Sequence, residues 1–176
     1  MGRPKLVILR GGAACGKSTA LYRLKKNKKF KDWAIIDNCS LKLQFENLGG
    51  EKMKEYGHGA LFFLLKTIMS TKRNIIVDEM SEKTLRKNIN YYINKYEYEI
   101  VTFQFAVSVE TAIKREVHRR ESVGLKSRGA SWVKRLHKFH EEKIDKNGIL
   151  INTDRFDKKG VEKFIIKNLK QLESHN

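Results

Sequence analysis

At 176 residues, with one proline and 40% apolar side chains, the chain has the composition of a single folded domain rather than of a disordered or repetitive polymer. No apolar run approaches the roughly 18 residues of a membrane-spanning helix, no signal-peptide pattern opens the sequence, and two cysteines make no disulfide framework, so we expect a cytoplasmic protein. Lys and Arg number 37 against 20 Asp and Glu, and the net charge of +17 favours nucleic acid as a partner, although a solvated lysine-rich surface would have the same composition.

Apolar patterning predicts strands and helices in alternation. Short continuous apolar runs indicate buried strands, and apolar residues at helical spacing indicate helices. In chain order the pattern predicts a strand at 6–9, a helix from 17 to about 26, a strand at 33–36, a helix at 51–70, a strand at 74–77, a helix at 83–95, a strand at 100–107, helices at 109–120 and 131–143, a strand at 148–151 and a C-terminal helix. This order favours an α/β fold, a parallel five-stranded sheet flanked by helices on both faces, with functional groups at the carboxyl ends of the strands.

The segment after the first strand carries the most specific motif. It has the sequence Gly-Gly-Ala-Ala-Cys-Gly-Lys-Ser, the G-x-x-x-x-G-K-S pattern of a phosphate-binding loop in its strand–loop–helix context. Small residues let backbone N–H groups converge on an anion, and the helix N-terminus adds partial positive charge. The motif predicts that Lys17 reaches the β- and γ-phosphates of ATP and that the Ser18 hydroxyl binds Mg²⁺. The predicted nucleotide-binding residues are Gly11, Gly12, Ala13, Ala14, Cys15, Gly16, Lys17, Ser18 and Thr19.

Acidic residues follow the second and third predicted strands. Asp37 comes directly after the strand at 33–36, and Asp78 and Glu79 come after the strand at 74–77. In a parallel sheet these positions meet the phosphate loop at one edge. We predict that Asp78 is the acid on the magnesium side and that Asp37 takes a proton from an acceptor hydroxyl. The choice between Asp78 and Glu79 stays open, and capping of a helix is the alternative role for each acid.

Basic residues gather on and after the helix that follows the fourth strand. Arg115 and Arg119 are four apart and share a helix face, and Arg120 opens a stretch with two glycines and further basic residues. Arginines on a mobile segment would close over a triphosphate and neutralise charge in the transition state. We therefore predict a basic helical lid at about 115–135 with these three arginines as catalytic groups. An exposed basic helix face with ion pairs is the alternative.

These motifs together resemble those of a known family. G-G-x-x-C-G-K-S-T, the Asp after the second strand, the Asp-Glu after the third, R-x-x-x-R-R and the closing I-L-I-N-T-D span nearly the whole chain. They are similar to the motifs of small P-loop kinases of the polynucleotide 5′-kinase, zeta-toxin and chloramphenicol phosphotransferase group. The resemblance implies the P-loop NTPase fold, one kinase domain over 1–176, Lys17 and Ser18 on phosphate and Mg²⁺, and Asp37 as general base.

The sequence departs from that family at one position, and the acceptor stays open. Polynucleotide kinases of this type usually carry Arg three residues after the base, where this chain has Ser40, and Lys42 is the nearest cation. Lysine lacks the bidentate fork of arginine. This departure weakens the prediction of a nucleic-acid acceptor, but it does not affect the prediction that the chain transfers phosphate.

The first hypothesis for the acceptor is the 5′-hydroxyl of RNA or DNA. The net charge, the lysine-rich end of the first helix and the basic lid favour it, with Lys42, Arg128 and Glu79 as acceptor-binding candidates. The second is a small-molecule kinase of the chloramphenicol phosphotransferase or nucleoside kinase type, which needs a partly apolar pocket. Core packing would equally explain the residues that could line it, which are Leu41, Leu43, Phe45, Tyr56, His58 and Phe62. A third hypothesis, a non-catalytic nucleotide-binding protein, leaves Asp37 without a role.

Overall fold

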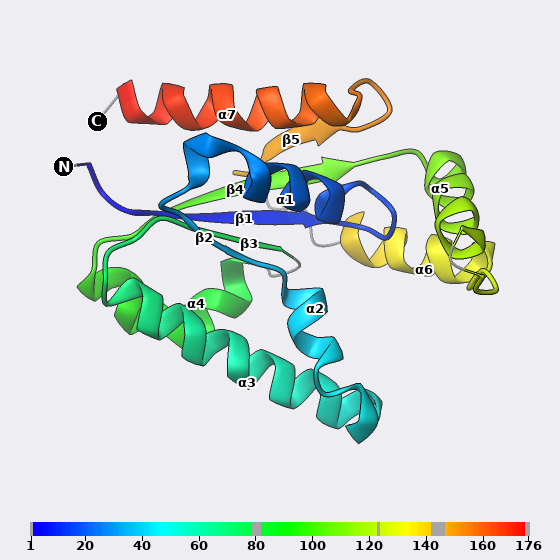
Figure 1. Cartoon of the computed structure of the whole chain (residues 1–176), viewed down its shortest axis with the longest axis horizontal. Helices are drawn as coiled ribbons and strands as arrows, with labels where there is room; N and C mark the ends of the chain where they lie inside the picture. Colours follow the sequence, from blue (N-terminus) through cyan, green and yellow to red (C-terminus); the bar gives the residue numbers. More distant parts are fainter. Residues whose placement is uncertain (1, 79–81, 123, 142–146, 175–176) are drawn as a thin grey trace.

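The computed structural model describes residues 2–78, 82–122, 124–141 and 147–174. Its centre is a five-stranded sheet in the order β2-β3-β1-β4-β5, in which every neighbouring pair is parallel (Figure 1). The predicted α/β fold is therefore confirmed. The strands are β1 (Lys5–Gly11), β2 (Ala34–Ile36), β3 (Ile75–Asp78), β4 (Glu99–Ala106) and β5 (Ile149–Asn152).

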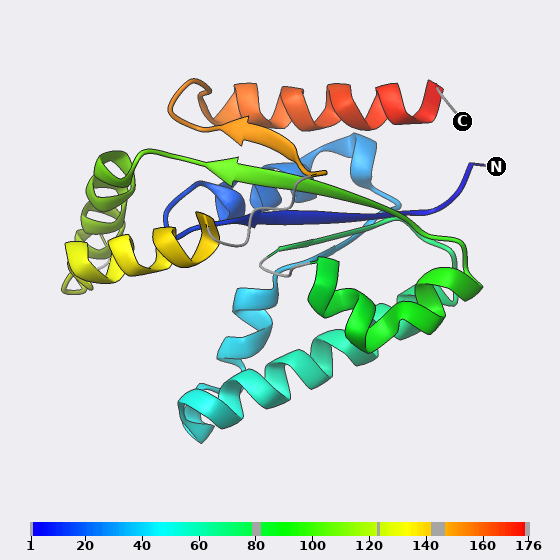
Figure 2. The ribbon, with the colours of Figure 1, turned by 180° about the vertical axis from the view of Figure 1, so that it is seen from behind.

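Helices cover both faces of the sheet, as the sequence predicts. They are α1 (Lys17–Lys26), α2 (Asn38–Leu43), α3 (Gly50–Met69), α4 (Glu82–Lys95), α5 (Val109–Glu121), α6 (Ala130–Glu141) and α7 (Lys158–Ser174), with 3₁₀ turns at Lys28–Phe30 and Glu46–Leu48. Figures 1 and 2 show α1 and α7 on one face, α3 and α4 on the other, and α5 and α6 beyond the carboxyl ends of β1 and β4. Among the described residues, no helix combines the length and hydropathy needed to cross a membrane.

Side chains of the central strands pack into two hydrophobic clusters, one on each face of the sheet. All seven residues of β1 are buried. Val7 and Leu9 pack with residues of α1 and α7, whereas Leu6 and Ile8 pack with residues of α3 and α4. Because successive side chains of a strand point to opposite faces, the middle of a strand that is covered on both sides is apolar at every position, as residues 6–9 are. This is the physical origin of the solid apolar runs in the sequence.

Strand register brings the two predicted acids to the same edge of the sheet as the phosphate loop. Leu9 of β1 pairs with Asp78, the last residue of β3, and Leu9 packs on the α1 side of the sheet. Ile36 of β2 pairs with Val77, so Asp37 comes one residue later, level with Asp78. Asp78 therefore belongs to the face from which α1 starts, and Asp37 follows the last paired residue of the neighbouring strand as the N-cap of α2.

Candidate active site

The loop between β1 and α1 presents unoccupied backbone donors. Gly16 lies in the left-handed region with φ 97° and precedes α1 without a side-chain cap, and Ala14 has φ 54°. Within the described part of the chain, the N–H groups of residues 13–16 donate no hydrogen bond. Backbone donors grouped at an uncapped helix N-terminus form an anion-binding site.

Two loop positions leave no room for a side chain. A Cβ on Gly11, where φ is +154°, would lie 2.5 Å from the Phe105 carbonyl oxygen of β4. A Cβ on Gly12 would lie 3.1 Å from the ring of His137, which comes from α6. The glycines therefore let the loop pass between β4 and α6.

The lysine of the motif is held by its own loop. Lys17 is buried, and its Nζ donates to the carbonyl oxygens of Gly11 and Gly12 at 2.8 and 2.9 Å, with the Cys15 Sγ at 3.6 Å. The two residues that follow, Ser18 and Thr19, are exposed at the start of α1. Among the described residues the acceptors of this ammonium group are all neutral, so it is well placed to exchange them for phosphate oxygens, because charge-assisted hydrogen bonds are stronger.

Asp78 connects β3 to the start of α2. Its carboxylate is fully buried, and Oδ1 accepts a hydrogen bond of 2.7 Å from the backbone N–H of Asn38. The side-chain amide of Asn38 is itself fully buried, and within the described residues it makes no hydrogen bond. A carboxylate and the hydroxyl of Ser18 are the hard oxygen ligands that Mg²⁺ prefers, so the residues present fit that ion.

Asp37 caps α2. Its Oδ1 accepts from the Ser40 N–H at 2.9 Å, and its Oδ2 accepts from the Ser40 hydroxyl at 2.7 Å. The capping role that the sequence left as an alternative is therefore present in the structure. It does not exclude a role as base, because Asp37 is only half-buried and each carboxylate oxygen keeps a further acceptor site. Ser40 occupies the position where the resembling polynucleotide kinases carry Arg.

The three predicted catalytic arginines have different partners. Arg115 donates from both terminal nitrogens to Thr153, to the hydroxyl at 3.0 Å and to the carbonyl at 2.9 Å. Arg119 pairs with Glu116, and its side chain is still 61% exposed. Arg120 donates from Nε to the backbone carbonyl of Lys126 at 3.0 Å. The structure thus anchors Arg115 at the end of β5, beside the loop that contains Gly16, and leaves Arg119 the most accessible to a ligand.

The predicted acceptor-binding residues are not brought together. Lys42 on α2 packs its stem over Gly57 of α3, where a Cβ would lie 2.5 Å from the lysine Cγ. Arg128 is exposed and stacks on Trp132, with 4.6 Å from its guanidinium carbon to the ring centroid. Glu79 lies outside the described residues.

The proposed apolar acceptor wall is divided between surface and core. Phe45 stacks on the half-exposed Tyr56 at 6.0 Å, and Leu43 is likewise half-exposed. Leu41 and Phe62 instead pack against the core on the α3 and α4 side.

His58 lies beside Phe62 on the same stretch of α3, with 6.3 Å between the ring centroids. Burial first, and then the positive charges of Lys42 and Lys54, hold the pKa of His58 below its usual value. The lowered pKa favours the neutral imidazole of His58 at pH 7, beside two lysine cations.

Three polar residues of the site have no signature in the sequence. Asn38, Glu116 and His137 are all buried, as is Thr153, which belongs to the closing I-L-I-N-T-D motif but was not predicted as a site residue. Each is a single polar residue in a helix or a strand end, and no spacing rule distinguishes it from a surface residue. Across the described residues, no group of three His, Cys, Asp or Glu could hold a metal ion.

Comparison with known proteins gives a structural likeness only. No protein-family model and no curated protein matches the sequence. A gluconokinase from Sinorhizobium meliloti is 10% identical, with a TM-score of 0.68 over 99% of this chain and 97% of that one. A deoxyadenosine kinase from M. mycoides is 20% identical, with a TM-score of 0.61 over 94% and 99%.

A third similar structure comes from a nucleic-acid repair assembly. A chain of the Pnkp1/Rnl/Hen1 RNA repair complex is 23% identical, with a TM-score of 0.65 over 82% of this chain and 47% of that one. This chain therefore spans about half the length of that protein. The likenesses confirm the five-stranded parallel fold of P-loop kinases and do not separate a polynucleotide kinase from a kinase of small molecules.

Proposed function

We propose that this chain is an ATP-dependent kinase that transfers the γ-phosphate to a hydroxyl group, with the 5′-hydroxyl of RNA or DNA as its acceptor. The observation that carries the proposal is the hydrogen bond from the N–H of Asn38 to Asp78. It joins the strand end that supplies Asp78 to the helix that Asp37 caps, on the sheet face from which the phosphate loop leads into α1.

The phosphate loop binds the triphosphate. Lys17 exchanges the carbonyl oxygens of Gly11 and Gly12 for oxygens of the β- and γ-phosphates, and the free loop N–H groups donate to the same anion. Ser18 and Asp78 are the residues that would hold Mg²⁺, which neutralises phosphate charge when it is bound.

Asp37 positions and deprotonates the acceptor. Its carboxylate takes the proton from the acceptor hydroxyl as the oxygen attacks the γ-phosphorus. A bond forms between the acceptor oxygen and phosphorus, the bond from phosphorus to the bridging oxygen breaks, and its electron pair leaves on ADP. The bonds from Ser40 to Asp37 fix the carboxylate in place for this step.

The region 115–135 acts as a lid in this proposal. Arg119 is paired with Glu116 and largely exposed, so its guanidinium can turn toward the transferring phosphate. Arg120 is the second candidate for this contact with phosphate. Arg115 instead anchors the lid to Thr153 at the end of β5.

Charge supports a polynucleotide acceptor. The net charge of +17 far exceeds what one nucleotide requires, and Arg128 stacked on Trp132 places a cation and an aromatic ring together on the lid. The second candidate, a small hydroxylated acceptor, is favoured by one specific observation, the stacked rings of Phe45 and the half-exposed Tyr56.

Transfer of labelled γ-phosphate tests the proposal. The acceptors are single-stranded RNA and DNA with a 5′-hydroxyl, the same oligonucleotides with a 5′-phosphate, and a panel of nucleosides, sugars and hydroxylated antibiotics. We expect label on the 5′-hydroxyl strands alone, and its loss with Lys17→Ala. Label on the small molecules alone establishes the second candidate, and no transfer to any acceptor despite ATP binding contradicts a kinase.

A further inference from the structure

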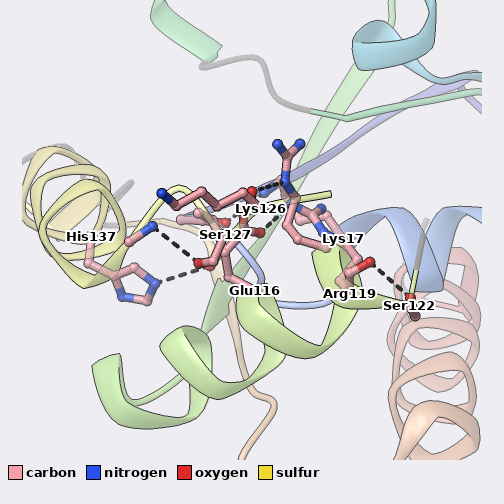
Figure 3. Close-up of polar contacts among 11 residues, drawn as sticks. Lys17, Glu116, Arg119, Ser122, Lys126, Ser127 and His137 are labelled. Carbon is pink, nitrogen blue, oxygen red and sulfur yellow. Dashed lines mark hydrogen bonds and ion pairs between the residues drawn. The ribbon is translucent and has the colours of Figure 1, made fainter. Parts of the chain in front are cut away.

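His137 of α6 contacts the backbone of the phosphate loop. Its ring is buried, with 6% of the residue exposed, and Nε2 lies 3.1 Å from the carbonyl oxygen of Ala13 (Figure 3). A carbonyl oxygen only accepts, so Nε2 carries the proton and donates. The same ring lies 3.1 Å from the position of a Cβ on Gly12, so the contact covers two consecutive loop residues.

This hydrogen bond fixes the orientation of one peptide group. In a trans peptide the carbonyl and the following N–H point in opposite directions. When His137 holds the Ala13 oxygen toward α6, the N–H of Ala14 is turned away from α6, and within the described residues that N–H has no acceptor. It is one of the loop donors available to an anion.

The peptide is held at an unfavourable backbone conformation. Ala14 has φ 54°, in the left-handed region, which costs a residue with a Cβ free energy that glycine does not lose. Such a conformation persists only where surrounding contacts determine it. The bond from His137 is a contact of that kind, and it comes from α6 rather than from the loop itself.

We propose that His137 is a positioning residue that couples α6 to the phosphate loop, by holding the Ala13–Ala14 peptide in the orientation that binds the triphosphate. The inference rests on the nucleotide-binding part of the proposed function and is independent of the acceptor. It gives α6 a role in nucleotide affinity, so that movement of the α5–α6 segment and the strength of phosphate binding depend on each other.

Calorimetric titration with Mg·ATP tests this role. His137→Phe keeps a buried ring but removes the donor, and we expect about 3- to 10-fold weaker binding, the effect of one lost hydrogen bond. His137→Gln keeps an N–H donor, and we expect it to recover at least half of the lost affinity on a logarithmic scale. The matched controls are His118→Phe and His118→Gln on α5, because His118 is exposed, and they should bind as the wild type does.

A second background separates positioning from general loss of structure. Ala14→Gly removes the cost of the left-handed conformation, so His137→Phe in that background should weaken binding less than about 2-fold. Wild-type affinity in His137→Phe, or an equal loss in both backgrounds, overturns the inference. If His137→Phe does not fold, His137→Leu, which also lacks a donor, is compared in the two backgrounds by the same criterion. Failure of the wild type to bind Mg·ATP instead overturns the proposed function.

Discussion

Lys17 donates to the carbonyl oxygens of two residues of its own loop, Gly11 and Gly12. These partners are neutral, and the ammonium group is buried beside backbone N–H groups that, among the described residues, donate to no internal acceptor. Replacing neutral acceptors by phosphate oxygens strengthens each hydrogen bond and leaves no buried carboxylate behind. At the scale of single residues, the loop is therefore arranged for an anion before one binds.

The two cysteines differ sharply in accessibility, and we expect them to differ in reactivity. Cys15 is 1% exposed within the phosphate loop, whereas Cys39 is exposed in α2. A thiol must be reached before it can react, so one of the two thiols should react quickly with a disulfide reagent in the native protein. Thiol titration of Cys39→Ser should show the fast phase gone. A fast phase that survives in Cys39→Ser, and vanishes in Cys15→Ser, would contradict the placement of Cys15.

Single residues differ in how far the sequence predicts them. Lys17 and Ser18 are predictable because fixed spacing, a preceding strand and a following helix all agree. Asp37 is predictable as an acid that follows a strand. Its two hydrogen bonds from Ser40 are not predictable, because an Asp that acts as a base and an Asp that caps a helix have the same sequence pattern at that position. His137 carries no signal at all, since its partner is a carbonyl oxygen 124 residues away.

At the scale of elements, α2 is the connection between sheet and site, and its position depends on a glycine. Gly57 lies in the buried face of α3, where a Cβ would approach the Lys42 Cγ to 2.5 Å and its Cα to 3.0 Å. For Gly57→Ala, the helix-propensity gain of about 1 kcal/mol opposes an overpacking cost of about 1–3 kcal/mol.

We expect Gly57→Ala to lower the free energy of unfolding by between about 0 and 2 kcal/mol, because the propensity gain offsets only part of the overpacking cost. The rate of phosphate transfer should fall even where the free energy of unfolding changes little, because α2 and its cap Asp37 must shift. Urea denaturation and phosphate-transfer rates measure the two effects. Gly59→Ala is the matched control, because a Cβ there meets nothing within 4 Å. Unchanged transfer rates in Gly57→Ala would show that α2 tolerates displacement.

A second link between elements is sensitive to pH. Glu162 of α7 accepts from the Asn27 side chain at 2.7 Å and from the Arg23 Nε of α1 at 2.8 Å. The hydrogen bond from Asn27 first, and then the bond and charge of Arg23, outweigh burial and hold the pKa of Glu162 below its ordinary value of 4.5. The ionised carboxylate therefore stabilises the fold above pH 4.5, and this contribution is lost as the pH falls through the lowered pKa.

Glu162→Gln should reduce the free energy of unfolding by about 1–2 kcal/mol at neutral pH, after allowance for the partly exposed Arg23. The difference from the wild type should shrink between neutral pH and about pH 3, because the wild-type carboxylate takes up its proton as the pH falls toward the lowered pKa. Urea denaturation at the two pH values measures it. A difference that is equal at both would mean that the charge of Glu162 does not hold α1 to α7.

Elements were predictable in proportion to their length and burial. The five strands and the long helices have solid or periodic apolar patterns, and the structure places each of them within a few residues of the predicted range. The six-residue α2 was missed because it is shorter than two helical turns and is defined by the cap at Asp37 rather than by a stripe. The strand order followed from no local pattern, since it depends on contacts between distant segments.

At the scale of the whole molecule, the excess positive charge is the property that most constrains the acceptor. With a net charge of +17, binding of a single-stranded oligonucleotide should release counterions and weaken with salt. Three neutralised phosphates predict about a 20-fold loss of affinity between about 50 and 200 mM salt. Fluorescence anisotropy with a 5′-hydroxyl RNA measures the slope. An affinity that does not change with salt concentration would contradict the inference from net charge to a polynucleotide acceptor, and would favour the small-molecule acceptor.

Phosphate transfer by Asp37→Asn is the most direct test of a site built where the strand ends meet. Asn caps helices as well as Asp does, so the free energy of unfolding should change by less than about 0.5 kcal/mol, and Mg·ATP should bind within about 2-fold of the wild type. The amide cannot take the acceptor proton, so kcat should fall by about 10²- to 10⁴-fold. The matched control is Asp32→Asn, an exposed acid before β2 that should keep wild-type turnover. An Asp37→Asn protein that folds, binds ATP and transfers phosphate at the wild-type rate would contradict the account.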